Sequence, residues 1–179
     1  VGPEWAYVEK RLARAKFSKD FLKAVRETYD PSDFFEVLDL NVLLYLRKSD
    51  DHGPQVTEQA VKEVQKFLNE NSRAMYVSEK KYKVPAPTIA SLLWIESRFG
   101  GNSGRYHVLS VYLHLLQAER PDVVRQLQAN AGKFTDKVTR KIEKEIRLRS
   151  QKKASWAMDE LKALAKMYDR NSKMVANLK

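Results

Sequence analysis

The 179-residue sequence is long enough to bury a sizeable core as one domain, or as one domain with an extension, and its 43% hydrophobic content is typical of globular proteins. It contains no cysteine, which excludes disulfides, thiolate metal sites and cysteine nucleophiles. Its formal net charge of +10 favours an anionic partner, whether nucleic acid, a membrane surface or a cell-wall polymer. No apolar run approaches the roughly eighteen residues of a membrane-spanning helix.

The first third of the sequence predicts helices joined by short turns. Apolar residues at helical spacing predict a helix over residues 4–15. Ser18 is a suitable N-cap for a second helix, which we expect to run to Tyr29. Residues 34–46 are mostly apolar, and their periodicity does not distinguish a buried helix from a strand. Residues 49–54 predict a loop.

The remaining segments also predict helices. A long amphipathic helix is expected over residues 57–82, and another follows Tyr106. Pro121 suits the first turn of the next helix. Two further helices are expected over residues 133–153 and 155–169. No alternation typical of strands and no internal repeat is evident, so the sequence predicts a mainly α fold.

The segment over residues 133–153 is rich in lysine and arginine and still carries an apolar residue every fourth position. This pattern has two interpretations. The segment is either an amphipathic helix with a solvated basic face or an electrostatic contact for an anionic polymer such as murein or nucleic acid. The residue types alone do not separate the two.

One stretch near the middle carries the candidate chemistry. It begins at Pro85, is apolar on nearly all sides of a helix, and stops at Gly100-Gly101. Its single ionisable residue before Ser97 is Glu96, which shares a helical face with apolar residues. We therefore expect Glu96 to be buried, which would raise its pKa and suit it to general-acid catalysis. A structural glutamate that pairs with a core arginine is the alternative.

Three glycines follow this helix, which predicts a C-cap and a tight turn with positive φ. These turn residues are Gly100, Gly101 and Gly104.

The spacing of several short motifs resembles the membrane-bound lytic murein transglycosylase B family of the lysozyme-like superfamily. That family carries a Tyr-Gly-Val-Pro, a Glu-Thr/Ser-x-Tyr/Phe-Gly, an Asn-x-Gly and a Val-Leu-Asp-Ala-Leu motif. The resemblance is dense over residues 82–116. The matching residues here are Tyr82-Lys83-Val84-Pro85, Glu96-Ser97-Arg98-Phe99-Gly100, Asn102-Ser103-Gly104 and Val108-Leu109.

The resemblance implies a lysozyme-like helical catalytic core over residues 54–179 with an N-terminal helical extension over residues 1–53. It implies that Glu96 is the catalytic acid and base. Substrate binding would involve the neighbouring polar residues Ser97, Arg98, Asn102, Arg105 and Tyr106. Two departures affect this expectation: Gly101 replaces a usual arginine, and Ser110-Val111 replaces Asp-Ala.

The resemblance also implies the reaction. A lytic transglycosylase cleaves the β-1,4 bond between N-acetylmuramic acid and N-acetylglucosamine and leaves 1,6-anhydro ends. Peptidoglycan strands, with other cell-wall enzymes as potential partners, are the expected ligands, and nucleic acid is not. We expect action in the bacterial periplasm or cell envelope after removal of an export signal, with membrane contact only through a removed lipid anchor.

The family's Gly-Ser-Tyr/Phe-Ala-Gly-Ala motif would follow Lys179, so we expect the core to be incomplete at its C-terminus. This leaves an alternative function: an inactive helical module that binds murein as a scaffold. No cofactor is expected. No metal is expected either, because His52, His107 and His114 show no ligand spacing on a shared helical face.

Overall fold

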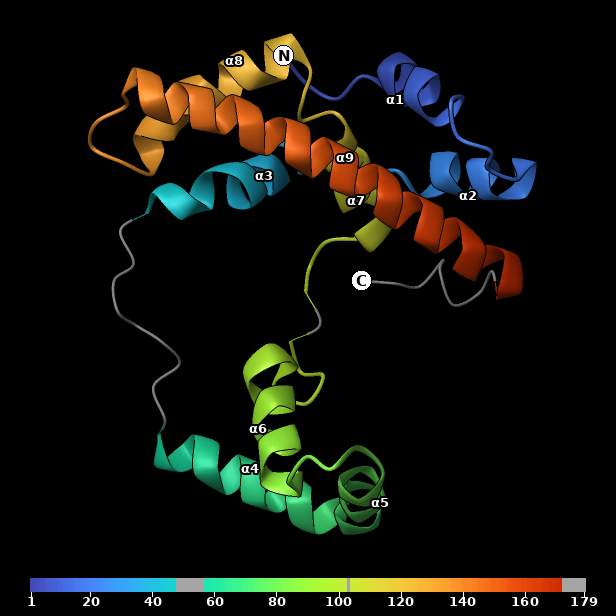
Figure 1. Cartoon of the computed structure of the whole chain (residues 1–179), viewed down its shortest axis with the longest axis vertical. Helices are drawn as coiled ribbons and strands as arrows, with labels where there is room; N and C mark the ends of the chain where they lie inside the picture. Colours follow the sequence, from blue (N-terminus) through green and yellow to red (C-terminus); the bar gives the residue numbers. More distant parts are fainter. Residues whose placement is uncertain (48–56, 103, 172–179) are drawn as a thin grey trace. The chain divides into compact units, whose positions relative to one another are not determined.

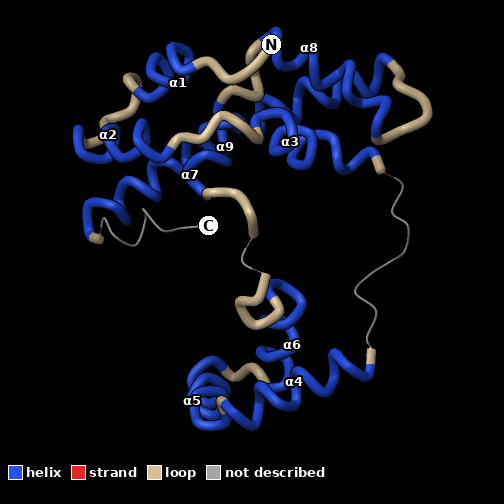
Figure 2. Tube along the Cα trace, turned by 180° about the vertical axis from the view of Figure 1, so that it is seen from behind, coloured by secondary structure: helices blue, strands red, loops and turns tan. Residues whose placement is uncertain are grey.

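The computed structural model describes residues 1–47, 57–102 and 104–171, and every regular element among them is a helix. The chain divides into two compact units (Figures 1 and 2). A larger unit combines the described residues up to 47 with those from 106 onward, and a smaller unit lies within residues 57–105. The predicted boundary at residues 53 and 54 lies outside the described residues and stays a prediction.

The larger unit is a helical bundle, and its elements begin where the sequence supplies caps or prolines. Ser18 accepts a hydrogen bond from the Phe21 amide, and Pro121 occupies the first turn of its helix. The elements are α1 (Trp5–Leu12), α2 (Lys19–Thr28), α3 (Phe34–Leu38), the π-helix η1 (Asp39–Leu43), the 3₁₀ helices η2 (Leu44–Leu46) and η3 (Ala131–Lys133), α7 (Val108–Leu116), α8 (Pro121–Asn130) and α9 (Arg140–Arg170).

Helix α7 is the central element of this bundle, because it is buried on opposite sides. Leu109, Leu113 and Leu116 pack into a cluster with residues of α1, α2 and α9. Leu115 packs into a second cluster with residues of α3, η1, α8 and α9. A helix that is apolar nearly all round belongs in the interior of a bundle, and this one is enclosed accordingly.

A buried polar group stands where the N-terminal segment meets α8. The Arg120 side chain is only 8% exposed and makes a two-point contact with the carboxylate of Asp122. It also lies 3.1 Å from a carboxylate oxygen of Glu4 and donates to the Gly2 carbonyl at 3.0 Å. Arginine is suited to such a cluster because its planar fork satisfies several acceptors at once.

The smaller unit contains three helices: α4 (Glu58–Glu70), α5 (Ser72–Tyr82) and α6 (Ala86–Ser97). Thr57 caps α4 by accepting a hydrogen bond from the Ala60 amide. Ala90 and Trp94 are the buried residues of α6, which contacts both α4 and α5. This unit positions the candidate site.

Three sequence-based expectations about elements need correction or completion. Residues 34–46 are helical throughout, which resolves the ambiguity between helix and strand. The helix expected over residues 57–82 is two helices, because the chain turns at Asn71, whose side-chain amide donates to the Phe67 carbonyl. The two helices expected over residues 133–153 and 155–169 are the single helix α9, since Ala154 is a strong helix former that is fully buried. This helix begins not at residue 133 but at Arg140, where the Thr139 side chain caps it by accepting from the Ile142 amide.

Candidate active site

Helix α6 carries Glu96 on a face that is exposed. Trp94 is buried on the opposite side of the helix, because two residues along an α-helix correspond to a rotation of about 200°. Glu96 is exposed, and its neighbours Leu92 and Ile95 are 53% and 49% exposed. The predicted burial of Glu96 is therefore wrong. A three-helix unit covers only one side of α6, so the desolvation that the prediction required is absent.

The chain leaves α6 through an unusual run of left-handed residues. Arg98, Phe99 and Gly100 have φ values of 50°, 56° and 86°. The first two amides close the helix end by donating to the Trp94 and Leu93 carbonyls at 2.8 and 3.4 Å. Residues with a Cβ adopt this conformation at a cost, so backbone strain of the kind found at functional sites begins two residues after Glu96.

Ser97 is the centre of the hydrogen bonds that hold this turn. Its hydroxyl donates to the Leu93 carbonyl at 3.1 Å and accepts from the Gly100 amide at 3.0 Å. Its own carbonyl accepts from the Asn102 amide at 2.8 Å. These contacts fix the backbone on both sides of Arg98, and they commit the Ser97 proton to the turn.

The first two turn residues are also anchored by aromatic rings. The guanidinium carbon of Arg98 lies 3.4 Å from the centroid of the Trp94 ring, a close cation–π contact. Phe99 stacks on Phe67 of α4 with the ring centroids 4.0 Å apart. The stacking of Phe99 on α4 and the contact of Arg98 with Trp94 offset part of the cost of the left-handed backbone.

Glu63 of α4 binds the indole of Trp94, the ring on which Arg98 lies, and so connects the turn to α4. Its carboxylate accepts from the Trp94 indole N–H at 2.6 Å and from the Gln59 amide at 2.9 Å. The Trp94 bond first, then the Gln59 bond and the Arg98 charge, lower the pKa of Glu63. The supporting roles of Glu63, Trp94 and Phe67 were not predicted from the sequence. The only signal was the helical spacing of Glu63 and Phe67 on one side of α4.

The other predicted site residues are distributed over both units. Asn102 and Arg105 are exposed and lie in the smaller unit with Glu96. Tyr106 is half-buried and begins the larger unit. The structure thus brings Glu96, Ser97, Arg98 and Asn102 to one helix end, whereas Tyr106 belongs to a separately described part of the molecule.

The predicted glycine turn is present in part. Gly100 and Gly104 have positive φ, at 86° and 83°, as predicted. Gly101 lies outside the left-handed region, and a Cβ there would meet the Arg98 carbonyl oxygen at 3.2 Å. Ser103, which the resemblance includes, lies outside the described residues.

Several carboxylates elsewhere could be considered as partners in catalysis, but each has a structural role. Glu63 lies on the Trp94 side of α6, away from the Glu96 face. In the larger unit, Glu119 pairs with Arg11 and accepts from Tyr7, and Asp122 pairs with Arg120. Among the residues that the structure places, Glu96 is therefore the one exposed carboxylate at the motif.

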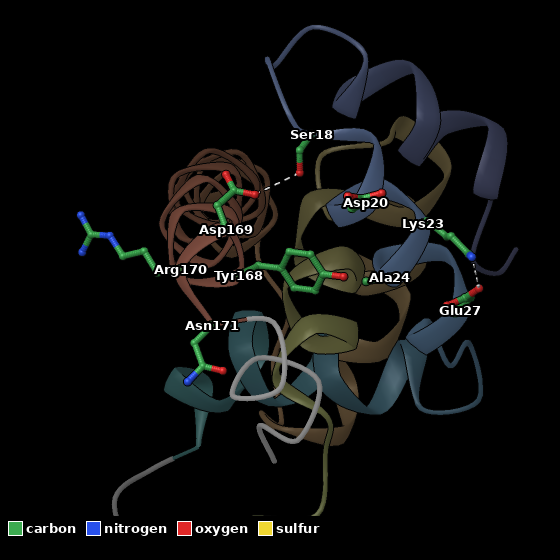
Figure 3. A pocket seen from close by; sticks show the side chains of 9 residues that line it. All are labelled: Ser18, Asp20, Lys23, Ala24, Glu27, Tyr168, Asp169, Arg170 and Asn171. Atoms are coloured by element: carbon green, nitrogen blue, oxygen red, sulfur yellow. Dashed lines mark hydrogen bonds and ion pairs between the residues drawn. The ribbon is translucent and has the colours of Figure 1, made fainter.

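A polar hollow of about 690 Å³ in the larger unit is separate from this motif (Figure 3). It lies between α2 and the end of α9. Ser18 donates to the Asp169 carboxylate at 3.1 Å, and Lys23 lies 3.9 Å from Glu27. None of the residues that the motifs select lines this hollow.

The described residues contain no group of three histidine, aspartate or glutamate side chains arranged to hold a metal ion. Of the three histidines, His114 is buried in the bundle and His107 occupies the N-cap position of α7 without a capping side-chain hydrogen bond, while His52 lies outside the described residues. None of the helices in the described ranges is long and apolar enough to cross a membrane.

Comparison with protein families gives one result that bears on this geometry. The profile of the Transglycosylase SLT domain matches residues 3–179, which is nearly the whole chain and includes the Glu96 motif. The comparisons with curated proteins and with solved structures returned no match. A family profile that spans this much of the sequence, together with the helical fold, establishes membership: the chain belongs to the transglycosylase SLT domain family.

Proposed function

We propose that this protein is a peptidoglycan lytic transglycosylase that acts in the bacterial cell envelope. It would cleave the β-1,4 bond between N-acetylmuramic acid and N-acetylglucosamine. The observation that carries the proposal is the exposed Glu96 carboxyl at the end of α6, within a chain of the transglycosylase SLT family. A polymeric glycan can reach a carboxyl only where the surrounding surface is open, and Glu96 meets this requirement.

Glu96 would serve twice in the reaction. As an acid, it donates its proton to the glycosidic oxygen that leaves with N-acetylglucosamine. As a base, it then takes the proton of the muramic 6-hydroxyl, whose oxygen attacks the anomeric carbon and closes a 1,6-anhydro ring. The proton that Glu96 loses in the first step is regained in the second, so the enzyme is unchanged and no water is consumed.

Among the described residues of the motif, Glu96 is the only carboxylate, which supports an internal nucleophile. Hydrolytic glycosidases use a pair of carboxyl groups, one of which activates water or attacks the sugar. Here Glu63, Glu119 and Asp122 are all held in hydrogen bonds or ion pairs of their own. The 6-hydroxyl is tethered to the reacting sugar and therefore has the advantage of a high effective concentration.

The surface around Glu96 also offers apolar and polar contacts for a bound glycan. Leu92, Leu93 and Ile95 are exposed next to the carboxyl. A glycan that lies on this apolar surface would exclude water from the place where the proton is transferred. The exposed Asn102 is the proposed hydrogen-bonding partner for the sugar, and Arg105 is the proposed cation for stem-peptide carboxylates. Ser97 and Arg98 would act by holding the turn.

The test is digestion of purified murein sacculi by the parent chain and by Glu96→Gln, with Glu70→Gln as a matched control. Glu70 is an exposed glutamate of the same unit, so its amide variant changes charge by the same amount. We expect soluble muropeptides from the parent and the control, and a loss of at least about 100-fold in Glu96→Gln. Equal digestion by both variants would contradict the assignment of Glu96.

Mass spectrometry of the products separates the mechanism from hydrolysis. Transglycosylation yields muropeptides with 1,6-anhydro ends and no reducing end, each lighter by one water than a hydrolysis product. Products with reducing ends would indicate a second catalytic carboxylate. The alternative function, a murein-binding scaffold, predicts that the chain sediments with sacculi and releases nothing.

A further inference from the structure

The outward face of α9 is a long basic surface that the proposed reaction does not use. The helix has 31 residues and so is about 46 Å long. One side is buried in the bundle, and α9 runs along the outside of the larger unit in Figure 1. We call its exposed side the α9 lysine face. It comprises the exposed residues Arg140, Lys141, Lys144, Arg147, Leu148, Lys152 and Trp156.

The cations of the α9 lysine face form no ion pairs with carboxylates of the described residues. In the described ranges, no ion pair joins Arg140, Lys141, Lys144, Arg147 or Lys152 to an acidic side chain. The acidic residues within or next to this row are Glu143, Glu145 and Asp159. Glu143 is exposed one turn from Arg140 and from Arg147, and it forms an ion pair with neither. Glu145 accepts from the Tyr45 hydroxyl at 3.4 Å, and Asp159 pairs with Lys162 one turn beyond the face.

Other basic residues of this helix have structural partners, which makes the contrast informative. Arg149 donates to the Val42 carbonyl at 3.2 Å, and its guanidinium lies 4.1 Å from the Tyr45 ring centroid. Lys153 lies 5.0 Å from the Trp156 ring centroid. Arg149 is therefore fixed against η1 and Lys153 against an aromatic ring, whereas the cations of the α9 lysine face have no such partner among the described residues.

Two large apolar side chains lie among these cations. Leu148 is 47% exposed in the middle of the lysine row, and Trp156 is 42% exposed near its end. Trp156 is held in place by an edge-on contact with Tyr112 of α7, with the ring centroids 5.3 Å apart. Protein surfaces that lie at the boundary between lipid headgroups and acyl chains commonly combine exposed leucine and tryptophan with lysine.

We propose that the α9 lysine face binds the surface of a bilayer that contains anionic phospholipids. The lysine and arginine ammonium and guanidinium groups would contact headgroup phosphates, while Leu148 and Trp156 enter the headgroup boundary. Long lysine side chains can follow the interface while their stems cover apolar surface. Nucleic acid and murein would satisfy the charges, but neither offers an apolar layer for Leu148, so the exposed apolar pair favours the bilayer.

The test is co-sedimentation of the full chain with vesicles of 30% phosphatidylglycerol in phosphatidylcholine, compared with vesicles of phosphatidylcholine alone. The patch variant is Lys141→Glu, Lys144→Glu and Lys152→Glu. The matched control reverses three exposed lysines elsewhere in the larger unit: Lys10→Glu, Lys16→Glu and Lys19→Glu. Both variants change the net charge equally, so a difference between them reports position on the surface.

We expect the parent to bind the anionic vesicles and not the neutral ones, with binding weakened by salt. The patch variant should bind at least about tenfold more weakly, because each surface lysine contributes appreciably to attraction by anionic lipid. The control should stay within about threefold of the parent. Equal loss in the two triple variants would mean that general charge is responsible and would overturn the proposal.

A second measurement reports contact at the face itself. Since the chain has no cysteine, a single cysteine can be introduced at Ser155, which is exposed beside the lysine row, and labelled with an environment-sensitive fluorophore. Anionic vesicles should increase and blue-shift its emission, whereas the same label at exposed Ser32 should not respond. Leu148→Ser should reduce the response.

Two outcomes would contradict the proposal even if the patch variant loses affinity. One is a silent label at Ser155 with vesicles present, which would exclude contact at this face. The other is retention of the chain by duplex DNA or by sacculi, lost in the patch variant, without binding to anionic vesicles. None of these measurements depends on Glu96, so they remain informative if the proposed reaction is wrong.

Discussion

His114 should make the larger unit sensitive to acid, because the core accepts only its neutral form. The ring is almost fully buried, with its Nε2 2.9 Å from the Asp30 carbonyl oxygen. A carbonyl can only accept, so Nε2 carries the proton, and the buried Nδ1 has no hydrogen-bond partner among the described residues. The rings of Tyr29 and Phe34 pack edge-on against the imidazole. A second proton on Nδ1 would find no acceptor there.

Burial lowers the pKa of His114 from 6.5 to about 4, and the Asp30 carbonyl with the Asp30 and Asp33 charges opposes this only in part. The unfolded chain therefore binds a proton near pH 6.5 that the folded chain does not bind until about pH 4. This stability is present above pH 6.5 and is lost as the pH falls towards 4. By linkage the loss is about 2.5 kcal/mol at pH 4.5 and about 1.4 kcal/mol at pH 5.5.

The assay compares the parent with His114→Gln, which keeps an N–H donor for the Asp30 carbonyl but does not titrate. Urea unfolding is followed at pH 7.0, 5.5 and 4.5 by tryptophan fluorescence in a Trp94→Phe background. Only Trp5 and Trp156 then report, and both belong to the larger unit. The carboxylates titrate in both proteins, so the difference between their pH dependences isolates the histidine.

We expect the parent to lose about 2.5 kcal/mol more than His114→Gln between pH 7.0 and 4.5, whatever the stabilities of the two proteins at neutral pH. The same pH dependence in both, within about 0.5 kcal/mol, would refute the reasoning. It would mean that the folded core accommodates the imidazolium, for example by solvent entry at Nδ1.

Three further predictions concern stability. In urea titrations, Gly100→Ala should destabilise the smaller unit by about 1 kcal/mol, because φ is 86° at this position. The control Gly132→Ala should be neutral or slightly stabilising, because φ is not left-handed there and a Cβ would meet nothing within 4 Å. Arg120→Ala should lower the free energy of unfolding by roughly 3 kcal/mol, measured by chemical denaturation. Arg120→Lys should recover only part of this stability, because lysine cannot make the two-point contact with Asp122. A loss below about 1 kcal/mol in Arg120→Ala would contradict the structural role of this arginine. Trp94→Phe keeps a ring under Arg98 but removes the indole N–H that donates to Glu63. The pKa of Glu63, followed by carboxyl NMR, should therefore rise towards its ordinary value. An unchanged titration would show that the 2.6 Å hydrogen bond is not the main cause of the lowered pKa.

The sequence by itself determined where most helices begin and which residues form the candidate motif. Ser18, Thr57 and Pro121 mark helix starts that the structure reproduces, because capping and proline preferences depend on the local chain alone. The spacing of Glu96 relative to Val84-Pro85 and Asn102 indicated the transglycosylase family for the same reason, because a motif is defined by residue types and their separation along the chain.

The tertiary structure decided what each apolar face contacts. The apolar residues around Glu96 and those of α7 have similar patterns in the sequence, yet Leu113 is fully buried whereas Leu92 is half-exposed. Periodicity shows that a face is apolar but contains no information about which element covers it. Contacts between residues distant in the chain also placed Glu63 beneath Trp94 and enclosed His114. Burial, and with it the ionisation of a buried group, is therefore a property of packing, which the local sequence does not encode.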